Sequence, residues 1–214
     1  QAARIKRELS QATNELGPAD QSAETFISYY EREPVGRDLR GAWLSSLAAR
    51  RQWQPFLQHY NDRSASDSLR CQSFTARIAL GQTQDLALDI ARQWLTPVSL
   101  PDCEQAFDWM RAQNALTPEL IEQRVRRALE NNNASFARQI AAGLPPDRAA
   151  PLLRWAALLE NPQKQIDALI ASPALEVEPK AQLAGWSRFA RVDRDGALRR
   201  YENFVRARKL TAET

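Results

Sequence analysis

The feature that most constrains the fold of this chain is a helical spacing of apolar residues that only short breaks interrupt. In the stretch 37–51, Leu39, Trp43, Leu44 and Leu47 recur at intervals of three and four, which places them on one face of a helix. Segments of this kind follow one another along the sequence, separated by short runs rich in Pro, Gly and Asn. Because short loops make consecutive helices antiparallel, the repeating unit is a helical hairpin.

The pattern predicts an all-α protein. We expect about thirteen helices, and hairpins that recur at roughly 30–35 residues, the spacing of helical-repeat arrays. The repeats are irregular, and no fixed template of Trp, Gly, Tyr and Pro recurs in them. We therefore expect an irregular α-solenoid, a superhelix of antiparallel hairpins, that forms a single domain over residues 1–214.

Local signals place several helix ends. Thr117 at the N-cap, Pro118 at the first helical position and acidic residues in the first turn form the strongest start signal. We also expect a helix over 2–16 and a second helix that begins with Ser22 as its N-cap. Pro34 and Gly36 then end that second helix.

Charge does not single out a nucleic-acid binder. The net charge is +3, and basic and acidic residues are interleaved except near the C-terminal end, where 188–209 holds eight basic and three acidic residues. One interpretation is a solvated helical face, and the other is a docking surface for an anionic partner. The arginines of that surface would be Arg188, Arg191, Arg194, Arg199, Arg200, Arg206 and Arg208.

A search for catalytic chemistry finds no active site. The single histidine, His59, has no neighbours in the sequence that complete a nucleophilic triad or a metal site. The pair Glu119 and Glu122 lies at a helix start, where the helix dipole favours carboxylates. We therefore expect no catalytic residue, no metal and no cofactor, and no apolar segment is long enough to span a membrane.

Aromatic side chains leave two interpretations open. All six tryptophans lie among Leu, Ala or Phe at helical spacing, which favours packing between helices. An exposed indole or phenol could instead stack on a sugar ring. The residues concerned are Trp43, Trp53, Trp94, Trp109, Trp155, Trp186, Tyr29, Tyr30, Tyr60 and Tyr201.

The only two cysteines, Cys71 and Cys103, are 32 residues apart, about one hairpin period. They could therefore face each other across adjacent hairpins. In an exported protein such a pair tends to be joined, whereas in a reducing compartment the two would be small buried thiols. The spacing alone leaves both possibilities open.

The order of several motifs resembles the helical superhelix of soluble lytic murein transglycosylases. The resemblance is best over 37–144. The matching residues are Leu39-Arg40, Trp43-Leu44, Trp53, Phe56-Leu57, Tyr60, Arg70-Cys71, Trp94-Leu95, Ser99-Leu100-Pro101, Cys103, Phe107, Trp109 and Leu116-Thr117-Pro118. The chain departs from the family at Thr96-Pro97, where a Val-Gly pair is usual, and at Glu104-Gln105, where Asp-Pro is usual.

The resemblance implies a function. Members of this family are periplasmic and cleave peptidoglycan glycan strands between N-acetylmuramic acid and N-acetylglucosamine, leaving a 1,6-anhydro product. A lysozyme-like C-terminal domain carries their catalytic Glu, and its motifs are absent from this sequence. The resemblance also implies a disulfide between Cys71 and Cys103. The sequence does not begin with Met, so we expect a mature form whose export signal has been removed, or an excised fragment.

We therefore expect the non-catalytic superhelical domain of a periplasmic lytic transglycosylase. Its partners would be peptidoglycan glycan strands and a C-terminal catalytic domain. The alternative is a helical-repeat scaffold of the tetratricopeptide kind, which would bind a protein or peptide partner. A nucleic-acid-binding solenoid is the weakest alternative, because the arginine surplus is diffuse.

Overall fold

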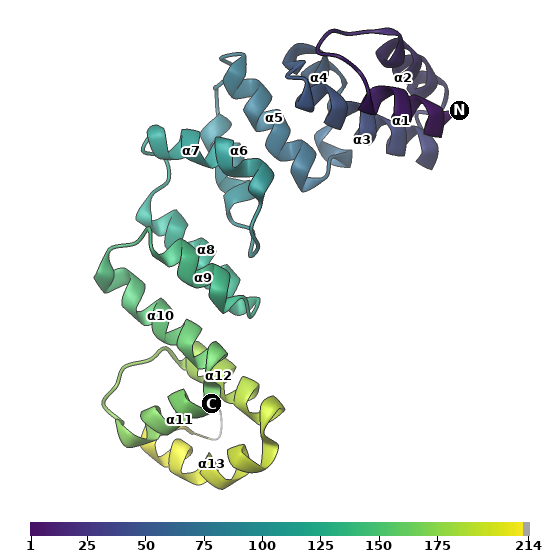
Figure 1. Cartoon of the computed structure of the whole chain (residues 1–214). Coiled ribbons are helices and arrows are strands. Elements are labelled where there is room, and N and C mark those ends of the chain that lie inside the picture. The colour runs from purple at the N-terminus through teal and green to yellow at the C-terminus, as the bar shows by residue number, and fades with distance from the viewer. Residues whose placement is uncertain (212–214) are drawn as a thin grey trace. The chain divides into compact units, whose positions relative to one another are not determined.

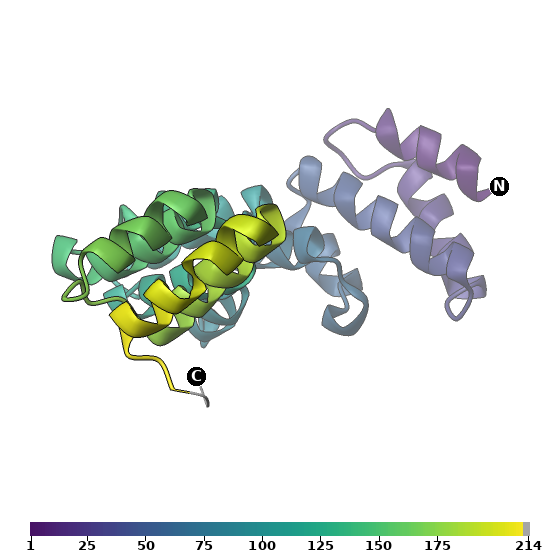
Figure 2. The same cartoon turned by 90° about the horizontal axis from the view of Figure 1, so that it is seen from below.

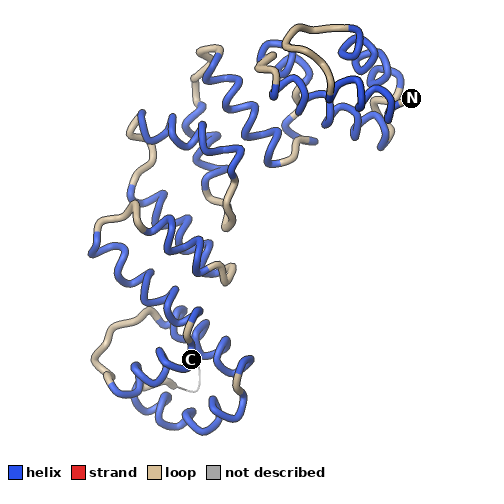
Figure 3. Tube along the Cα trace, viewed as in Figure 1, coloured by secondary structure: helices blue, strands red, loops and turns tan. Residues whose placement is uncertain are grey.

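The computed structural model describes residues 1–211. This part of the chain holds thirteen α-helices and two short 3₁₀ helices, and Figure 3 shows only helices and loops in it. The predicted all-α fold of helical hairpins is confirmed. The helices form two compact units: Gln1–Gln93 with Leu100–Ala115, and Trp94–Ser99 with the described residues from Leu116 onward.

The first unit contains the helices before residue 116, and the helix pairs that pack together in it are close in the sequence (Figure 1). Its core gathers Ile5, Leu39, Leu47 and Phe56, all fully buried. The helices are α1 (Ala2–Ser10), α2 (Pro18–Tyr29), α3 (Pro34–Ala49), α4 (Trp53–His59), η1 (Asp62–Ser64), α5 (Asp67–Ala79), α6 (Leu86–Trp94), η2 (Pro101–Cys103) and α7 (Glu104–Ala112).

Two expected boundaries at the start of this unit are wrong. The helix expected over 2–16 ends at Ser10, because backbone carbonyls of the following loop accept hydrogen bonds from Arg50 and Gln52 instead of continuing the helix. Helix α2 begins at Pro18, not after Ser22. Proline fits the first helical position, and the Asp20 carboxylate accepts the Gly17 N–H at 2.9 Å.

A third expectation concerned the break after α2. Pro34 does not merely end a helix, since it is the first residue of α3, with Glu33 as the N-cap. Gly36 lies in the first turn of α3, where an added Cβ would lie 1.9 Å from the Tyr30 carbonyl oxygen. The glycine therefore permits the close approach of α3 to the end of α2.

The second unit packs its helices in the same hairpin manner, and α12 and α13 lie side by side (Figures 1 and 2). Its core includes Leu129, Leu152, Ile166 and Phe189. The helices are α8 (Pro118–Glu130), α9 (Ala134–Ala141), α10 (Pro146–Glu160), α11 (Pro162–Ala171), α12 (Pro179–Val192) and α13 (Arg194–Arg208). Thr117 caps α8 as expected, accepting the Leu120 N–H.

The segment Trp94–Ser99 is held against α8 by a buried arginine. Arg124 is 3% exposed and donates to the carbonyls of Thr96 and Val98 at 3.3 and 3.0 Å. Its guanidinium lies 4.2 Å from the centre of the Trp94 ring, and the Trp94 indole donates to the Leu120 carbonyl. The backbone of this proline-containing segment is therefore satisfied by side chains rather than by a helix.

Over residues 1–211, no helix combines the length and the apolar character that crossing a membrane requires.

Candidate functional site

The two cysteines meet in the first unit. Cys71 lies in the middle of α5 and Cys103 ends η2, and a disulfide joins them across a Cα–Cα distance of 4.6 Å. Both residues are fully buried. Pro101 begins η2 and so sets the turn that carries Cys103 to α5. The pairing implied by the family resemblance is present in the structure.

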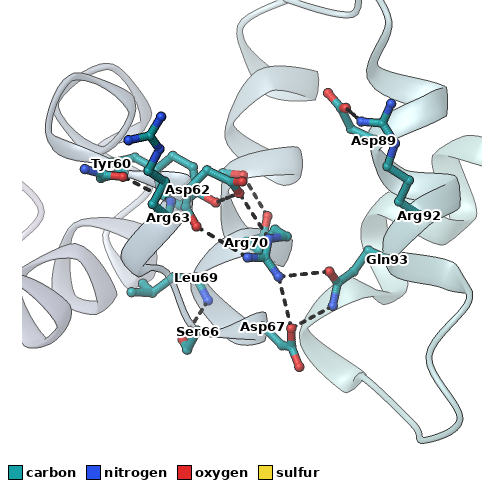
Figure 4. A network of polar contacts seen from close by, with 12 residues as sticks. Tyr60, Asp62, Arg63, Ser66, Asp67, Leu69, Arg70, Asp89, Arg92 and Gln93 are labelled. Atoms are coloured by element: carbon teal, nitrogen blue, oxygen red, sulfur yellow. Dashed lines mark hydrogen bonds and ion pairs between the residues drawn. The ribbon is translucent and has the colours of Figure 1, made fainter.

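A network of polar contacts surrounds Arg70, the residue before Cys71 (Figure 4). Arg70 donates from Nε to Asp62 at 3.0 Å and from Nη1 to Asp67 at 3.2 Å. Gln93 of α6 accepts from Arg70 at 3.3 Å and donates to Asp67 at 3.0 Å. Arg70 thus ties η1 and α6 to α5, beside the disulfide.

Tyr60 completes this network. Its hydroxyl donates to Asp62 at 2.9 Å. Burial, together with this hydrogen bond, raises the pKa of Tyr60 to about 12. The hydrogen bond from Arg70, with that from Tyr60, lowers the pKa of Asp62. The charges of this network are therefore compensated within it, and we interpret the network as structural.

Other acidic side chains also accept hydrogen bonds. Arg148 hydrogen-bonds both members of the pair Glu119 and Glu122. It lowers the pKa of Glu119 to about 2, and it is the first cause of a lowered pKa at Glu122. Asp193 accepts the Gly196 N–H at 2.8 Å at the start of α13. These carboxylates accept hydrogen bonds, whereas a general acid needs a raised pKa.

His59 packs against a neighbouring helix. Its ring is 4.6 Å from the Trp43 ring, and Nε2 is 3.6 Å from a Glu24 oxygen. Within residues 1–211, no group of three or more His, Cys, Asp or Glu side chains has the geometry of a metal site.

The seven arginines of α12 and α13 divide into two groups. Arg200 binds Asp167 of α11 at 2.5 Å, and Arg208 donates to Gln182 and to the Pro173 carbonyl, each at 2.9 Å. These two arginines hold the helices of the second unit together. The other five are exposed, and no hydrogen bond or ion pair to the rest of residues 1–211 holds them: Arg188, Arg191, Arg194, Arg199 and Arg206.

Arg188 and Arg191 share a further property, because both line one cleft with Trp155 and Lys180. Sequence reasoning named the two arginines, and it named Trp155 only as a packing or sugar-stacking residue, whereas Lys180 was not named. The signal available was the spacing on α12, where Lys180, Ala184, Ser187, Arg188 and Arg191 follow intervals of three and four. The contribution of Trp155 from α10 left no signal in the sequence.

The structure thus defines a class: an all-α helical-hairpin protein with a disulfide and with most of its charged groups paired. Comparison with known proteins places the chain more closely. It is 22% identical over 210 residues to the soluble lytic murein transglycosylase of Escherichia coli strain K12, covering 96% of this chain and 32% of the relative. The relative from Salmonella typhimurium strain LT2 is 23% identical over 189 residues, or 88% of this chain and 29% of that protein.

Solved structures agree. The 70-kDa soluble lytic transglycosylase of Escherichia coli matches 99% of this chain and 34% of its own, with a TM-score of 0.74 at 19% identity. An inactive mutant of lytic transglycosylase Slt from Pseudomonas aeruginosa matches 95% of this chain and 32% of its own, with a TM-score of 0.67 at 23% identity. No protein-family model matches. The chain is homologous to the soluble lytic murein transglycosylases and spans about a third of their length.

Proposed function

We propose that this chain is a non-catalytic helical part of a peptidoglycan lytic transglycosylase, which shapes access of the glycan strand and supports the catalytic part. The observation that carries the proposal is the sequence similarity to soluble lytic murein transglycosylases over 96% of the chain. The parent enzyme would cleave between N-acetylmuramic acid and N-acetylglucosamine and leave 1,6-anhydro products.

The electrostatics support the non-catalytic role. The carboxyl groups with a shifted pKa are Asp20, Asp62, Glu119, Glu122 and Glu178, and each shift is downward. Arginine contacts contribute to every one of these shifts. Such groups stay ionised at neutral pH, so they bind and position rather than donate a proton.

The disulfide supports a periplasmic location. Disulfides persist in oxidising compartments such as the bacterial periplasm and are rare in the reducing cytosol. Cys71 and Cys103 would accordingly be joined in protein made in its native compartment. Peptide mapping by mass spectrometry without reducing agent tests this, and two alkylatable thiols would instead favour the cytosolic peptide-binding scaffold.

The proposed role is tested with purified peptidoglycan sacculi. We expect the chain to co-sediment with sacculi and to release no 1,6-anhydro muropeptides, with the Escherichia coli relative as the positive control for release. Anhydro products released by this chain alone would overturn the non-catalytic role. Failure to co-sediment would argue against direct contact with the glycan mesh.

A further inference from the structure

A cleft in the second unit lies between the end of α8, the helix α10 and one face of α12. It has a volume of about 350 Å³. Leu129 and Asn132 line it from the α8 side, Trp155 from α10, and Lys180, Arg188 and Arg191 from α12. We refer to it as the α12 cleft.

The α12 cleft carries a surplus of positive charge. Lys180 is paired with Glu130, which also lines the cleft. Arg188 and Arg191 are exposed and make no hydrogen bond or ion pair with other side chains of residues 1–211. Three cations therefore face one carboxylate. Some other arginines of this unit are matched by acidic side chains, as Arg148 is by Glu119 and Glu122. Three arginines of α13 are exposed and unpaired within residues 1–211 as well, but they do not line this cleft: Arg194, Arg199 and Arg206.

A second observation concerns the indole of Trp155, which is 2% exposed. Its Nε1–H is the one buried side-chain polar group that lacks a hydrogen-bond partner within the described chain. The buried tryptophans Trp43 and Trp94 do donate, to Asp20 and to the Leu120 carbonyl. Buried donors are nearly always paired, so this N–H is an exception, and it belongs to a residue of the cleft wall.

The unpaired charged groups at the α12 cleft are two guanidinium groups, and the buried indole N–H of Trp155 is a third unpaired donor. The side chains of Ser187 and Asn132, which also line the cleft, can both donate and accept. The ligand must supply acceptors and negative charge, which is the chemistry of a carboxylate, the group that the arginine fork matches. Apolar atoms of Leu129, Leu183 and Ala184 lie in the same lining and suit small aliphatic side chains. Together these features fit a short peptide with a free carboxylate.

We propose that the α12 cleft binds the carboxylate of a short peptide, and that the peptide is the stem of peptidoglycan, with Arg188 and Arg191 as the binding cations. The identity of the peptide rests on the proposed function above. The carboxylate specificity rests on the cleft itself. The site would hold the murein mesh against the helical part, away from any cleavage reaction.

Isothermal titration calorimetry tests the proposal with N-acetylmuramyl-L-alanyl-D-isoglutamine, which bears a free carboxylate. Chitotriose, which bears none, is the ligand control. We expect the dipeptide to bind, with an affinity that falls as salt is raised, and chitotriose to bind at least tenfold more weakly. The double variant Arg188→Gln/Arg191→Gln should lower the affinity for the dipeptide about tenfold or more.

The matched control is Arg199→Gln/Arg206→Gln, which removes the same charge from exposed positions of α13 that do not line the cleft. It should leave the affinity within about twofold of wild type, since surface charges outside the site act weakly. Trp155→Phe replaces the indole by a smaller aromatic ring without the donor, so it should weaken binding while the folded state persists.

Three results would overturn the site: no binding of the dipeptide by wild type, equal losses in the two double variants, or equal affinity for chitotriose. Each of these leaves the proposed function standing, because the sacculus assay judges that separately. Conversely, release of anhydro products would overturn the non-catalytic role. Binding of the dipeptide would still support the α12 cleft as a binding site.

Discussion

Asp20 of α2 and Arg50, the C-cap residue of α3, form an ion pair in which both side chains are 6% exposed. Arg50 donates to the two carboxylate oxygens at 2.6 and 3.1 Å. The Trp43 indole and the Gly17 N–H donate to the same carboxylate at 2.8 and 2.9 Å. A single buried carboxylate therefore fixes the start of α2 and joins it to α3.

The variant Asp20→Asn tests this arrangement. It keeps the shape of the side chain but leaves Arg50 as a buried, uncompensated charge, which costs about 3–5 kcal/mol. We expect urea unfolding to show a loss of this size. The control is Asp38→Asn, whose partner Lys6 lies in a pair that is 35% and 67% exposed, so a loss under about 1 kcal/mol is expected. Equal losses in the two variants would contradict the assignment.

The pH dependence of stability follows from the same carboxylate. Burial alone favours the neutral acid, but the hydrogen bonds from Arg50, Gly17 and Trp43 outweigh it and hold the pKa of Asp20 below 3.8. The folded state thus releases this proton more readily than the unfolded state. Its stabilisation is complete above the usual pKa and is lost as the pH falls through the lowered one. Unfolding experiments between about pH 5 and pH 2 should show a smaller decline for Asp20→Asn than for wild type.

The disulfide predicts a separate loss of stability. Cys71 and Cys103 close a loop with a sequence separation of 32, and removing such a cross-link costs about 3–4 kcal/mol in the chain-entropy model. We expect Cys71→Ala/Cys103→Ala to lose this amount without reductant. Reduced wild type should then unfold at a similar urea concentration. An oxidised wild type no more stable than the double variant would contradict the expectation.

Much of the local structure could be predicted from the sequence, because the signals were local. The apolar spacing around Trp43 and Leu47 and the cap at Thr117 each depend on neighbours within one turn or two. The expectation of Ser22 as the N-cap misses the start of α2, because the missing N–H of Pro18 suits a first helical turn. The start of α2 is fixed by Asp20, whose partner Arg50 is 30 residues away in the sequence.

The candidate sites also combine features that the sequence predicts with features that depend on contacts between distant residues. The cysteine pairing came from resemblance, since spacing alone left two free thiols equally open. The arginines of 188–209 could be listed, but their roles depend on distant partners: Asp167 holds Arg200, and Pro173 and Gln182 hold Arg208. Periodicity within one helix does not reveal which residues of another helix meet it.

The contact of α10 with α12 predicts a steric effect at Gly185. A Cβ at this position would lie 2.8 Å from Leu158 Cδ2 and 2.9 Å from Leu158 Cβ. Leu158 is buried, so Gly185→Ala should cost about 1–3 kcal/mol through overpacking. Gly41 is the control, since no atom lies within 4 Å of its added Cβ in the middle of α3. Gly41→Ala should stabilise the chain by about 0.5–1 kcal/mol in urea unfolding.

Two of the buried tryptophans, Trp43 and Trp155, provide a matched pair of variants. Replacement by Phe removes a similar volume from each, because the two are 3% and 2% exposed. Trp43→Phe also removes the donor to the Asp20 carboxylate at 2.8 Å, and a hydrogen bond to a charged group contributes about 1.5–3 kcal/mol. Trp155→Phe removes an N–H that has no partner in the described chain, so nothing is lost beyond the volume.

Trp43→Phe should therefore destabilise the chain by about 1.5–3 kcal/mol more than Trp155→Phe does. Urea unfolding followed by circular dichroism measures both without relying on tryptophan emission. If Trp155→Phe were the more destabilising variant, the indole N–H would have an acceptor in the free protein. That result would remove one of the two observations behind the α12 cleft, whereas the predicted order would leave the N–H available to an incoming carboxylate.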